Sequence, residues 1–302
     1  MTPESPSAWS DLGGGIRVRQ SRAFRMNSVL LLHPTAAVAV DPGVLPSELD
    51  ELAGAVREAS ARSVTLVFTH AHWDHVLGRA WWPGAKSVAH DRFASELNRD
   101  RERILGEARG LAGKHGETWE RGFEAFRPDL AVSGLHFMRL DPWRLVLRDA
   151  PGHCDSQLSL HLPERRLLLA ADMLSDIEIP WLNRACEVYR RTLEDLLPLA
   201  RGGAIETLVP GHGSIARGRE AVLMRLHRDL DYLERLETGV RDALRQGLTV
   251  EAARSRLETM EYLGKDSSET PTREIHLQNV EHAYRGLEAA GPPKPPSASP
   301  AR

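Results

Sequence analysis

Three histidines and one aspartate fall within six consecutive positions, as His70, His72, Asp74 and His75. They follow the apolar run 64–68, which predicts a buried β-strand, so the four side chains lie in a turn at the end of that strand. Neutral imidazole and carboxylate are the ligand types that suit zinc, iron or manganese. A turn after a strand lets such side chains converge on one point. We therefore interpret this segment as a metal-binding motif and not as a surface turn with chance histidines.

Three more residues of the same chemistry follow strand-like runs further along the chain. His153 stands in Pro-Gly-His, Asp172 in Ala-Ala-Asp, and His212 in Pro-Gly-His-Gly. Neighbouring glycines let the backbone approach closely and adopt the dihedral angles that aim a side chain into a cluster. Each segment alone is compatible with an ordinary turn or a helix cap. Together with the first motif they supply five histidines and two aspartates, enough for two metal ions with open coordination positions.

In this order the motifs resemble those of the metallo-β-lactamase-fold hydrolases, whose pattern is His-x-His-x-Asp-His followed by separate His, Asp and His ligands. The resemblance covers about residues 15–215. It implies an α+β fold, a four-layer αβ/βα sandwich in which helices flank two packed β-sheets. The charged, helix-compatible stretch 91–127 is then a helical insertion that caps the metal site, and 216–290 is a helical C-terminal extension.

The resemblance also assigns roles to residues of this chain. It implies a first metal held by His70, His72 and His153, a second held by Asp74, His75 and His212, and a bridging Asp172. Asp41, in an Asp-Pro-Gly segment, would orient one of the ligands, although that tripeptide also makes a turn by itself. We expect two Zn²⁺ ions as cofactors, with iron or manganese as alternatives.

The reaction that the resemblance implies is hydrolysis. A hydroxide shared by the two metals attacks an electrophilic carbonyl or phosphorus, while the metals polarise the oxygen under attack. Asp74 is the expected catalytic residue, since it would both ligate a metal and orient the hydroxide.

Spacing and neighbouring residues narrow the substrate class. The short spacings from His153 to Asp172 and onward to His212 leave no room for the extra domain of the nucleic-acid-processing branch. β-Lactamases of this fold lack the bridging aspartate. What remains resembles the glyoxalase II-like and lactonase-like branch, so we expect a carboxylic ester, thioester or lactone. Glutathione thioesters are disfavoured, because Cys154 and Ala171 replace residues usual in glyoxalase II and no basic cluster for glutathione carboxylates is evident.

Other interpretations remain open. Phosphodiester cleavage, as in a phosphodiesterase or nuclease of the same fold, is the runner-up activity. A mononuclear iron sulfur dioxygenase and a non-catalytic binding protein are further alternatives. For the substrate pocket, Trp73 and Trp181 are candidates for an apolar wall that holds an acyl chain, although both are equally compatible with the core. Tyr189 is a weaker candidate, as a hydroxyl near the metals, and a core position is favoured for it.

Composition restricts the partners and the compartment. A formal net charge of −3 provides no basic field, which argues against a nucleic-acid partner, and no apolar run reaches the about 18 residues that a membrane helix needs. Two cysteines against 13 histidines favour a cytoplasmic protein with a small-molecule substrate. A homodimer is compatible with the sequence. We expect residues 1–14 to be flexible and the Pro-rich segment 291–302 to be disordered.

Overall fold

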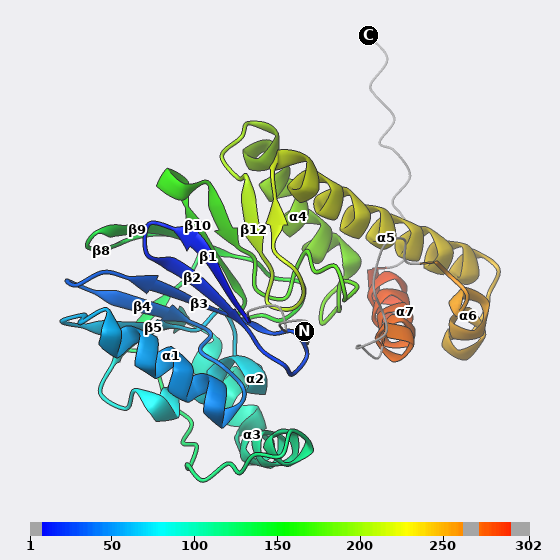
Figure 1. The fold of residues 1–302 in the computed structure, drawn as a ribbon. Coiled ribbons are helices and arrows are strands. Elements are labelled where there is room, and N and C mark those ends of the chain that lie inside the picture. Colours follow the sequence, from blue (N-terminus) through cyan, green and yellow to red (C-terminus); the bar gives the residue numbers. More distant parts are fainter. Residues whose placement is uncertain (1–7, 262–271, 291–302) are drawn as a thin grey trace, which may run out of the picture.

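The computed structural model describes residues 8–261 and 272–290. The predicted disordered tail 291–302 lies outside these residues. The pattern of the sequence also predicts a break in the helical extension near 265–272, of which only residue 272 is described. In the described part the strands form two sheets that pack face to face (Figure 1). The first sheet has the order β1 (Trp9–Gly13), β2 (Ile16–Gln20), β3 (Asn27–Leu32), β4 (Ala37–Val40), β5 (Val64–Val67), β6 (Lys86–His90), β7 (Leu130–Val132). The second has the order β13 (Ala216–Arg217), β12 (Thr207–Val209), β11 (Leu167–Leu169), β10 (Leu158–Leu162), β9 (Trp143–Asp149), β8 (Leu135–Leu140).

Strand direction divides the first sheet into two halves. Strands β1 to β4 pair antiparallel, and β4 to β7 pair parallel. In β3, Val29 and Leu31 face the second sheet, whereas Leu30 faces the outer helices. In β11, Leu168 faces the outer helices, whereas Leu167 and Leu169 face the first sheet. Because successive side chains point to opposite faces, continuous apolar runs in these strands are buried on both sides.

Helices cover the outer face of each sheet, which confirms the predicted four-layer sandwich. On the first sheet lie α1 (Pro46–Glu58), α2 (Trp73–Val76), the 3₁₀ turn η1 (Leu77–Trp81) and α3 (Phe93–Lys114) (Figure 1). On the second lie α4 (Cys186–Arg201) and α5 (Arg219–Arg245), with α6 (Val250–Leu257), α7 (Thr272–Ala290) and the short turn η2 (Pro163–Arg165) completing the described elements. Helix α1 starts on Pro46, whose fixed φ suits the first helical position, and buries Leu49, Leu52 and Val56.

The predicted flexibility of residues 1–14 is wrong for its second half. Residues 9–13 form β1, which pairs antiparallel with β2. Three consecutive glycines, 13–15, make the connecting turn with positive φ angles of 79°, 59° and 83°, a region that favours glycine. Pairing with β2 satisfies the backbone groups of a segment whose composition alone indicated a frayed end.

The stretch 91–127 is helical only in part. Helix α3 ends at Lys114, and no helix follows before β7 in the described residues. Its apolar face, including Phe93, Leu97 and Ile104, packs in the same buried cluster as α1 and Phe68. Because this face is buried against the first sheet, α3 belongs to the outer layer of the sandwich. The many charged residues on its other face obscured the amphipathic pattern in the sequence.

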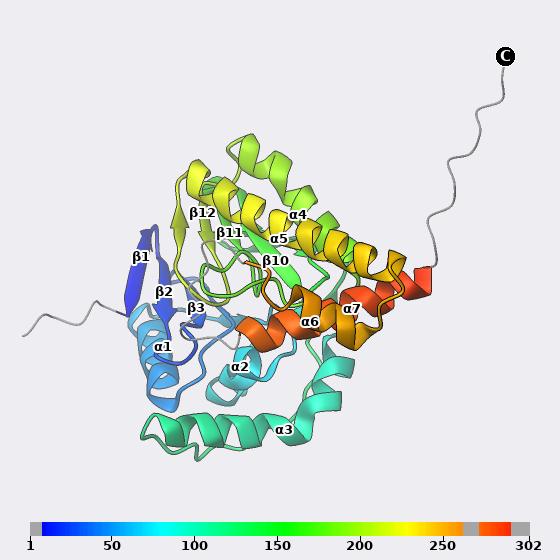
Figure 2. The same cartoon turned by 90° about the vertical axis from the view of Figure 1, so that its right-hand side faces the viewer.

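The helical extension begins later than predicted. Residues 216–217 form β13 and pair with β12, so helix starts at Arg219. Helices α5 and α7 share one buried cluster that includes Leu226, Leu233 and Val280. Figure 2 shows α7 between α5 and α3 at one edge of the sandwich. None of the described helices combines the length and apolarity needed to cross a membrane.

Candidate metal centre

Seven side chains singled out by the sequence converge at one edge of the sandwich, where strands of both sheets end. They are His70 and His72 after β5, Asp74 and His75 in α2, His153 between β9 and β10, Asp172 after β11, and His212 after β12. Loops at strand ends can aim side chains from distant parts of the chain at one point. The ligand atoms fall into two groups that share Asp172.

The first donor set consists of His70 Nε2, His72 Nδ1, His153 Nε2 and Asp172 Oδ2. His153 Nε2 lies 2.9 Å from His72 Nδ1. Asp172 Oδ2 lies 3.3 Å from His153 Nε2 and 3.5 Å from His70 Nε2. A tetrahedral metal bound at about 2.0–2.1 Å separates its ligand atoms by about 3.4 Å. The first donor set therefore has the dimensions of a metal site.

The second donor set consists of His75 Nε2, His212 Nε2, Asp74 Oδ2 and Asp172 Oδ1. His75 Nε2 lies 3.4 Å from His212 Nε2 and 3.2 Å from Asp172 Oδ1. Asp74 Oδ2 lies 3.3 Å from His212 Nε2 and 3.7 Å from His75 Nε2. These spacings again match the edges of a small coordination polyhedron.

Asp172 joins the two sets, because each of its carboxylate oxygens faces a different one. Asp172 Oδ1 and His70 Nε2 are buried and have no hydrogen-bond partner in the described part of the chain. Buried polar atoms without a partner are costly, so both atoms fit a role as metal ligands. Gly211 packs against this carboxylate so closely that a Cβ there would overlap Asp172 Oδ1.

The histidines of the first donor set are neutral in the metal-free protein. Burial lowers the pKa of His153 to about 3 and also lowers the pKa of His70 and of His72. A neutral imidazole keeps the lone pair that a metal ion requires. The first donor set is therefore ready to bind a metal without releasing a proton near neutral pH.

The histidines of the second donor set behave in the opposite way. Burial opposes protonation of His75, but Asp172 and Asp74 outweigh it and raise its pKa. The pKa of His212 rises to about 10, because nearby carboxylates, Glu178 first, likewise outweigh burial. Protons thus balance the buried carboxylates where a cation is absent, which shows that this cluster favours positive charge.

One carboxylate orients a histidine of each donor set. Asp41 accepts hydrogen bonds from His75 Nδ1 at 2.9 Å, from Thr69 N at 2.7 Å and from Thr69 Oγ1 at 2.5 Å. Because the Thr69 hydroxyl donates to Asp41, its oxygen accepts from His70 Nδ1 at 3.0 Å. Both imidazoles are thereby held in the tautomer that leaves Nε2 free for a metal, as second-layer groups do in metal sites. These contacts support an orienting role for Asp41, which stays a prediction.

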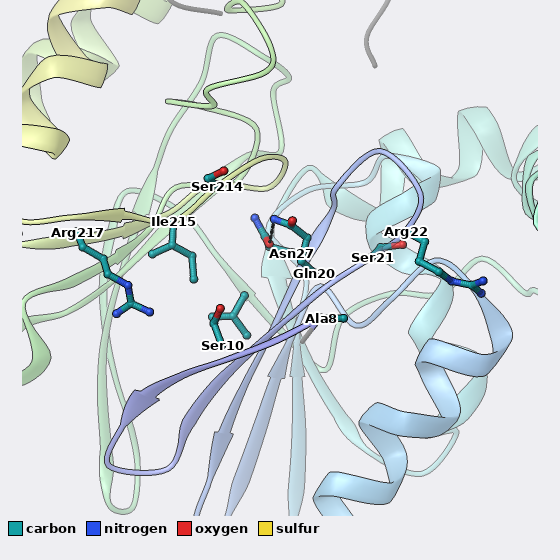
Figure 3. Close-up of a pocket in the computed structure, with 10 residues that line it drawn as sticks. Ala8, Ser10, Gln20, Ser21, Arg22, Asn27, Ser214, Ile215 and Arg217 are labelled. Atoms are coloured by element: carbon teal, nitrogen blue, oxygen red, sulfur yellow. Dashed lines mark hydrogen bonds between the residues drawn. The ribbon is translucent and has the colours of Figure 1, made fainter. Parts of the chain in front are cut away.

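Hydrogen bonds with residues 20–27 hold the loop that carries His212 in place. His212 Nδ1 donates to the Phe24 carbonyl at 3.0 Å, which again leaves Nε2 free. Asn27 Nδ2 donates to the carbonyls of Pro210 and Gly213, and Gln20 Nε2 reaches the Gly213 carbonyl as well as Asn27 Oδ1 (Figure 3). The pocket in Figure 3, about 440 Å³, lies on this side of the loop and has no histidine or carboxylate in its lining.

A smaller pocket of about 240 Å³ opens on the donor sets. Its wall includes five apolar side chains from four parts of the chain: Phe24, Trp73, Ile179, Trp181 and Ile275. Trp73 and Trp181 therefore line the pocket, one of the two positions that we considered for them. The Trp181 ring lies 5.9 Å from the ring of His153, and its Nε1 donates to Gln278 of α7 at 3.1 Å.

Tyr189 does not line this pocket, and the expectation of a hydroxyl beside the metals is wrong. The side chain is fully buried in the cluster between the second sheet and α5. Its ring fills the space beside Gly152, where a Cβ would clash with it. Its hydroxyl donates to the backbone carbonyl of Asp172 at 3.1 Å, so Tyr189 helps to hold the backbone of this ligand candidate in place.

Several pocket residues have no signal in the sequence. Phe24 and Ile275 are distant from every ligand motif, and Arg103 belongs to a charged helix. Glu178 also lines the pocket, and burial raises its pKa to about 7. Its only indication was its place shortly after Asp172, within the same irregular segment that carries Trp181.

Comparison with known proteins identifies the family. Residues 22–212 match the Metallo-beta-lactamase superfamily, and the chain belongs to this superfamily. Two curated relatives are named Acyl-coenzyme A thioesterase MBLAC2, from Bos taurus and Homo sapiens. They are 26% and 27% identical to this chain over 232 residues, which is 68% of this chain and 80% of each relative.

Two solved structures share the fold. The sec-alkylsulfatase Pisa1 from Pseudomonas sp. has a TM-score of 0.74 and 16% identity, over 95% of this chain and 52% of that one. A metallo-beta-lactamase family protein from Thermus thermophilus has a TM-score of 0.64 and 21% identity, over 93% of this chain and 95% of that one. This chain therefore spans about half of the sulfatase. At these identities the likeness shows the fold alone.

Proposed function

We propose that this protein is a metal-dependent hydrolase of acyl thioesters with a dinuclear site. The observation that carries the proposal is the position of Asp172, whose two carboxylate oxygens lie 3.2–3.7 Å from imidazole nitrogens of different donor sets. A nitrogen-rich set completed by carboxylates suits Zn²⁺, so two Zn²⁺ ions are the proposed cofactors. When bound, such ions polarise a carbonyl oxygen and lower the pKa of water towards neutrality.

The residues of this chain divide the remaining work. Asp74 belongs both to the second donor set and to the lining of the pocket. Its carboxylate is thereby placed to accept a hydrogen bond from the attacking water and to fix the direction of attack. Asp41 and Thr69 keep the imidazoles of both sets in the required tautomer. Catalysis then depends on a site that is organised before the substrate enters.

The pocket wall supports an acyl substrate. Aromatic and aliphatic side chains next to a few convergent polar groups are typical of pockets for small molecules with an apolar part. A thioester is favoured over an ester, because a thiolate is a better leaving group and needs no proton donor: thiols have a pKa of about 8.5. The relatives named acyl-coenzyme A thioesterases support the same bond.

Metal analysis combined with a substrate panel tests the proposal. The panel contains acyl thioesters, p-nitrophenyl esters, lactones and bis-p-nitrophenyl phosphate. We expect two zinc ions per chain and the highest kcat/KM on a thioester. Preference for bis-p-nitrophenyl phosphate would establish a phosphodiesterase instead, and one iron with oxygen consumption on a persulfide would establish a sulfur dioxygenase. Metal binding without turnover of any substrate would leave a binding protein.

A further inference from the structure

Four arginines lie on α3 and in the segment that follows Trp181, although the sequence shows no basic cluster. We refer to Arg92, Arg99, Arg103 and Arg184 as the mouth arginines. Three belong to α3 or its N-cap, spaced by seven and four residues, so they lie along one face of the helix. Arg103 lines the pocket itself. Arg184 follows Trp181, another residue of the pocket lining, by three residues.

Asp155 holds part of this cluster together. Arg184 binds both oxygens of Asp155 through its Nε and Nη2 atoms, and Arg92 Nη1 lies 3.8 Å from Asp155 Oδ2. The hydrogen bonds from Arg184 lower the pKa of Asp155, and the charges of Arg92 and Arg99 lower it further. Asp155 stands two residues after the ligand candidate His153, in the same loop. Asp155 and the buried Glu96 together carry two negative charges against these three guanidinium groups, so a positive excess remains.

Arg103 is available to a ligand. Its side chain is 62% exposed, and the nearest acidic partner among the described residues is Glu107, with Nε and Oε1 4.0 Å apart. That distance exceeds a hydrogen bond, so the guanidinium retains its donors. Glu96, which shares this face of α3, is buried and accepts a hydrogen bond from Ser156 Oγ, and its negative charge acts on Arg184.

We propose that the mouth arginines bind phosphate groups on the thiol half of the substrate. The inference rests on the proposed thioesterase function. In this arrangement the acyl chain lies against Trp73 and Trp181, the thioester lies at the donor sets, and the phosphorylated thiol half extends over α3. Guanidinium groups bind phosphate oxygens through paired hydrogen bonds, which a scattered set of surface lysines would not provide.

A pair of matched substrates tests this inference. Octanoyl-coenzyme A has phosphates on its thiol half, and octanoyl-pantetheine has none. We expect the wild type to prefer the coenzyme A thioester by at least about tenfold in kcat/KM, the equivalent of one to two charged hydrogen bonds. In Arg99→Ala/Arg103→Ala the ratio of the two kcat/KM values falls to about threefold or less, because octanoyl-coenzyme A loses more rate than octanoyl-pantetheine does. High salt has the same effect on the wild type, since these contacts are exposed.

Arg101→Ala is the matched control. Arg101 lies on the same helix with the same 62% exposure, but it points to another face, where Glu102 is its neighbour. This variant must keep the wild-type preference. An octanoyl group on the phosphopantetheine arm of a carrier protein is the second phosphorylated substrate. The substrate whose phosphate the mouth arginines bind, coenzyme A or the carrier protein, is the one that loses rate in the double variant.

The outcomes separate this inference from the proposed function. Equal rates on both thioesters, or a preference that survives the double substitution, would overturn the role of the mouth arginines and leave the thioesterase intact. If neither thioester is hydrolysed, the thioesterase fails. The zinc-loaded protein is then titrated with the thioethers S-octyl-coenzyme A and S-octyl-pantetheine. Equal affinities would overturn the phosphate site, and tighter binding of the coenzyme A thioether that is lost in the double variant would support it.

Discussion

Asp41 accepts a hydrogen bond from Nδ1 of His75 over 2.9 Å, although Asp41 follows β4 and His75 lies in α2, 34 residues further along the chain. The same carboxylate accepts from the hydroxyl of Thr69, through which it also orients His70. One side chain thereby fixes the tautomer of a histidine in each donor set. The proposed dinuclear site depends on this shared support.

Asp41→Asn is predicted to weaken both donor sets. The amide nitrogen of asparagine is a donor, and it would face groups that already donate. Loss of such a supporting group typically costs about 10–100-fold in metal affinity or activity. Competition with a zinc chelator measures the affinity. Asp50→Asn, which changes an exposed carboxylate of α1 bonded to Trp81, is the control. Unchanged zinc affinity in Asp41→Asn would show that the hydrogen bond has no role in the site.

Gly211→Ala is predicted to displace the bridging carboxylate. A Cβ at this position would overlap Asp172 Oδ1 and press on the backbone of Ala171. We expect the variant to fold, to lose one zinc per chain and to lose at least about 100-fold in turnover, the equivalent of about 2.7 kcal/mol in the activation barrier. Gly106→Ala in α3 is the control, because nothing lies within 4 Å of its Cβ position. A fully active Gly211→Ala would contradict the bridging role of Asp172.

Metal uptake by the two donor sets is predicted to differ in its pH dependence. The pKa of His212 is about 10 and that of His75 is also raised, so both hold a proton at neutral pH that a metal must displace. Affinity of the second set therefore rises with pH, about tenfold per pH unit for each proton released. The pKa values of the first set are lowered, so its affinity stays nearly constant between about pH 6 and 8. Zinc titrations at three pH values measure both, and parallel slopes would contradict the assignment.

Trp181→Ala is predicted to change chain-length preference. The indole forms part of the apolar wall and is held by Gln278. Its removal should lower kcat/KM for long acyl thioesters by about five- to thirtyfold, which corresponds to about 1–2 kcal/mol of lost burial. Acetyl thioesters, which have little apolar surface to bury against the wall, are the internal control. An equal loss on acetyl and long-chain thioesters would place Trp181 outside the acyl pocket.

The sequence predicted the parts of this structure that depend on local patterns. His70, His72, Asp74 and His75 are adjacent in the chain, and the remaining ligand candidates stand in recognisable turns after apolar strands, so the family and the convergence of the seven side chains were predictable. The N-terminal strand was missed because its stability comes from pairing with β2 and not from its own composition.

The pocket required the tertiary structure. Phe24, Ile275 and Arg103 meet only because α7 and α3 pack on opposite sides of the same opening. Tyr189, for which a core position was favoured, could not be assigned firmly, because one aromatic residue in an amphipathic helix gives no indication whether it faces the core or the site. The mouth arginines are far apart in the sequence. The helical spacing of α3 puts three of them on one face, and Arg184 is held by its hydrogen bonds to Asp155.

Asp74→Asn is predicted to leave a folded protein with very low turnover. The substitution removes the charge that the second donor set uses and that orients the attacking water in the proposal. We expect kcat to fall by at least about 1,000-fold, or about 4 kcal/mol, while the metal-free protein still melts cooperatively. Near-normal turnover would contradict the proposed role of Asp74.

Titration of the metal-free protein with Zn²⁺, with thioester hydrolysis followed at each addition, tests the central claim most directly. We predict that activity is absent without metal and rises until two zinc ions are bound per chain, where it reaches its plateau. Full activity with a single zinc ion, or two bound zinc ions without hydrolysis of any acyl thioester, would contradict a dinuclear thioesterase.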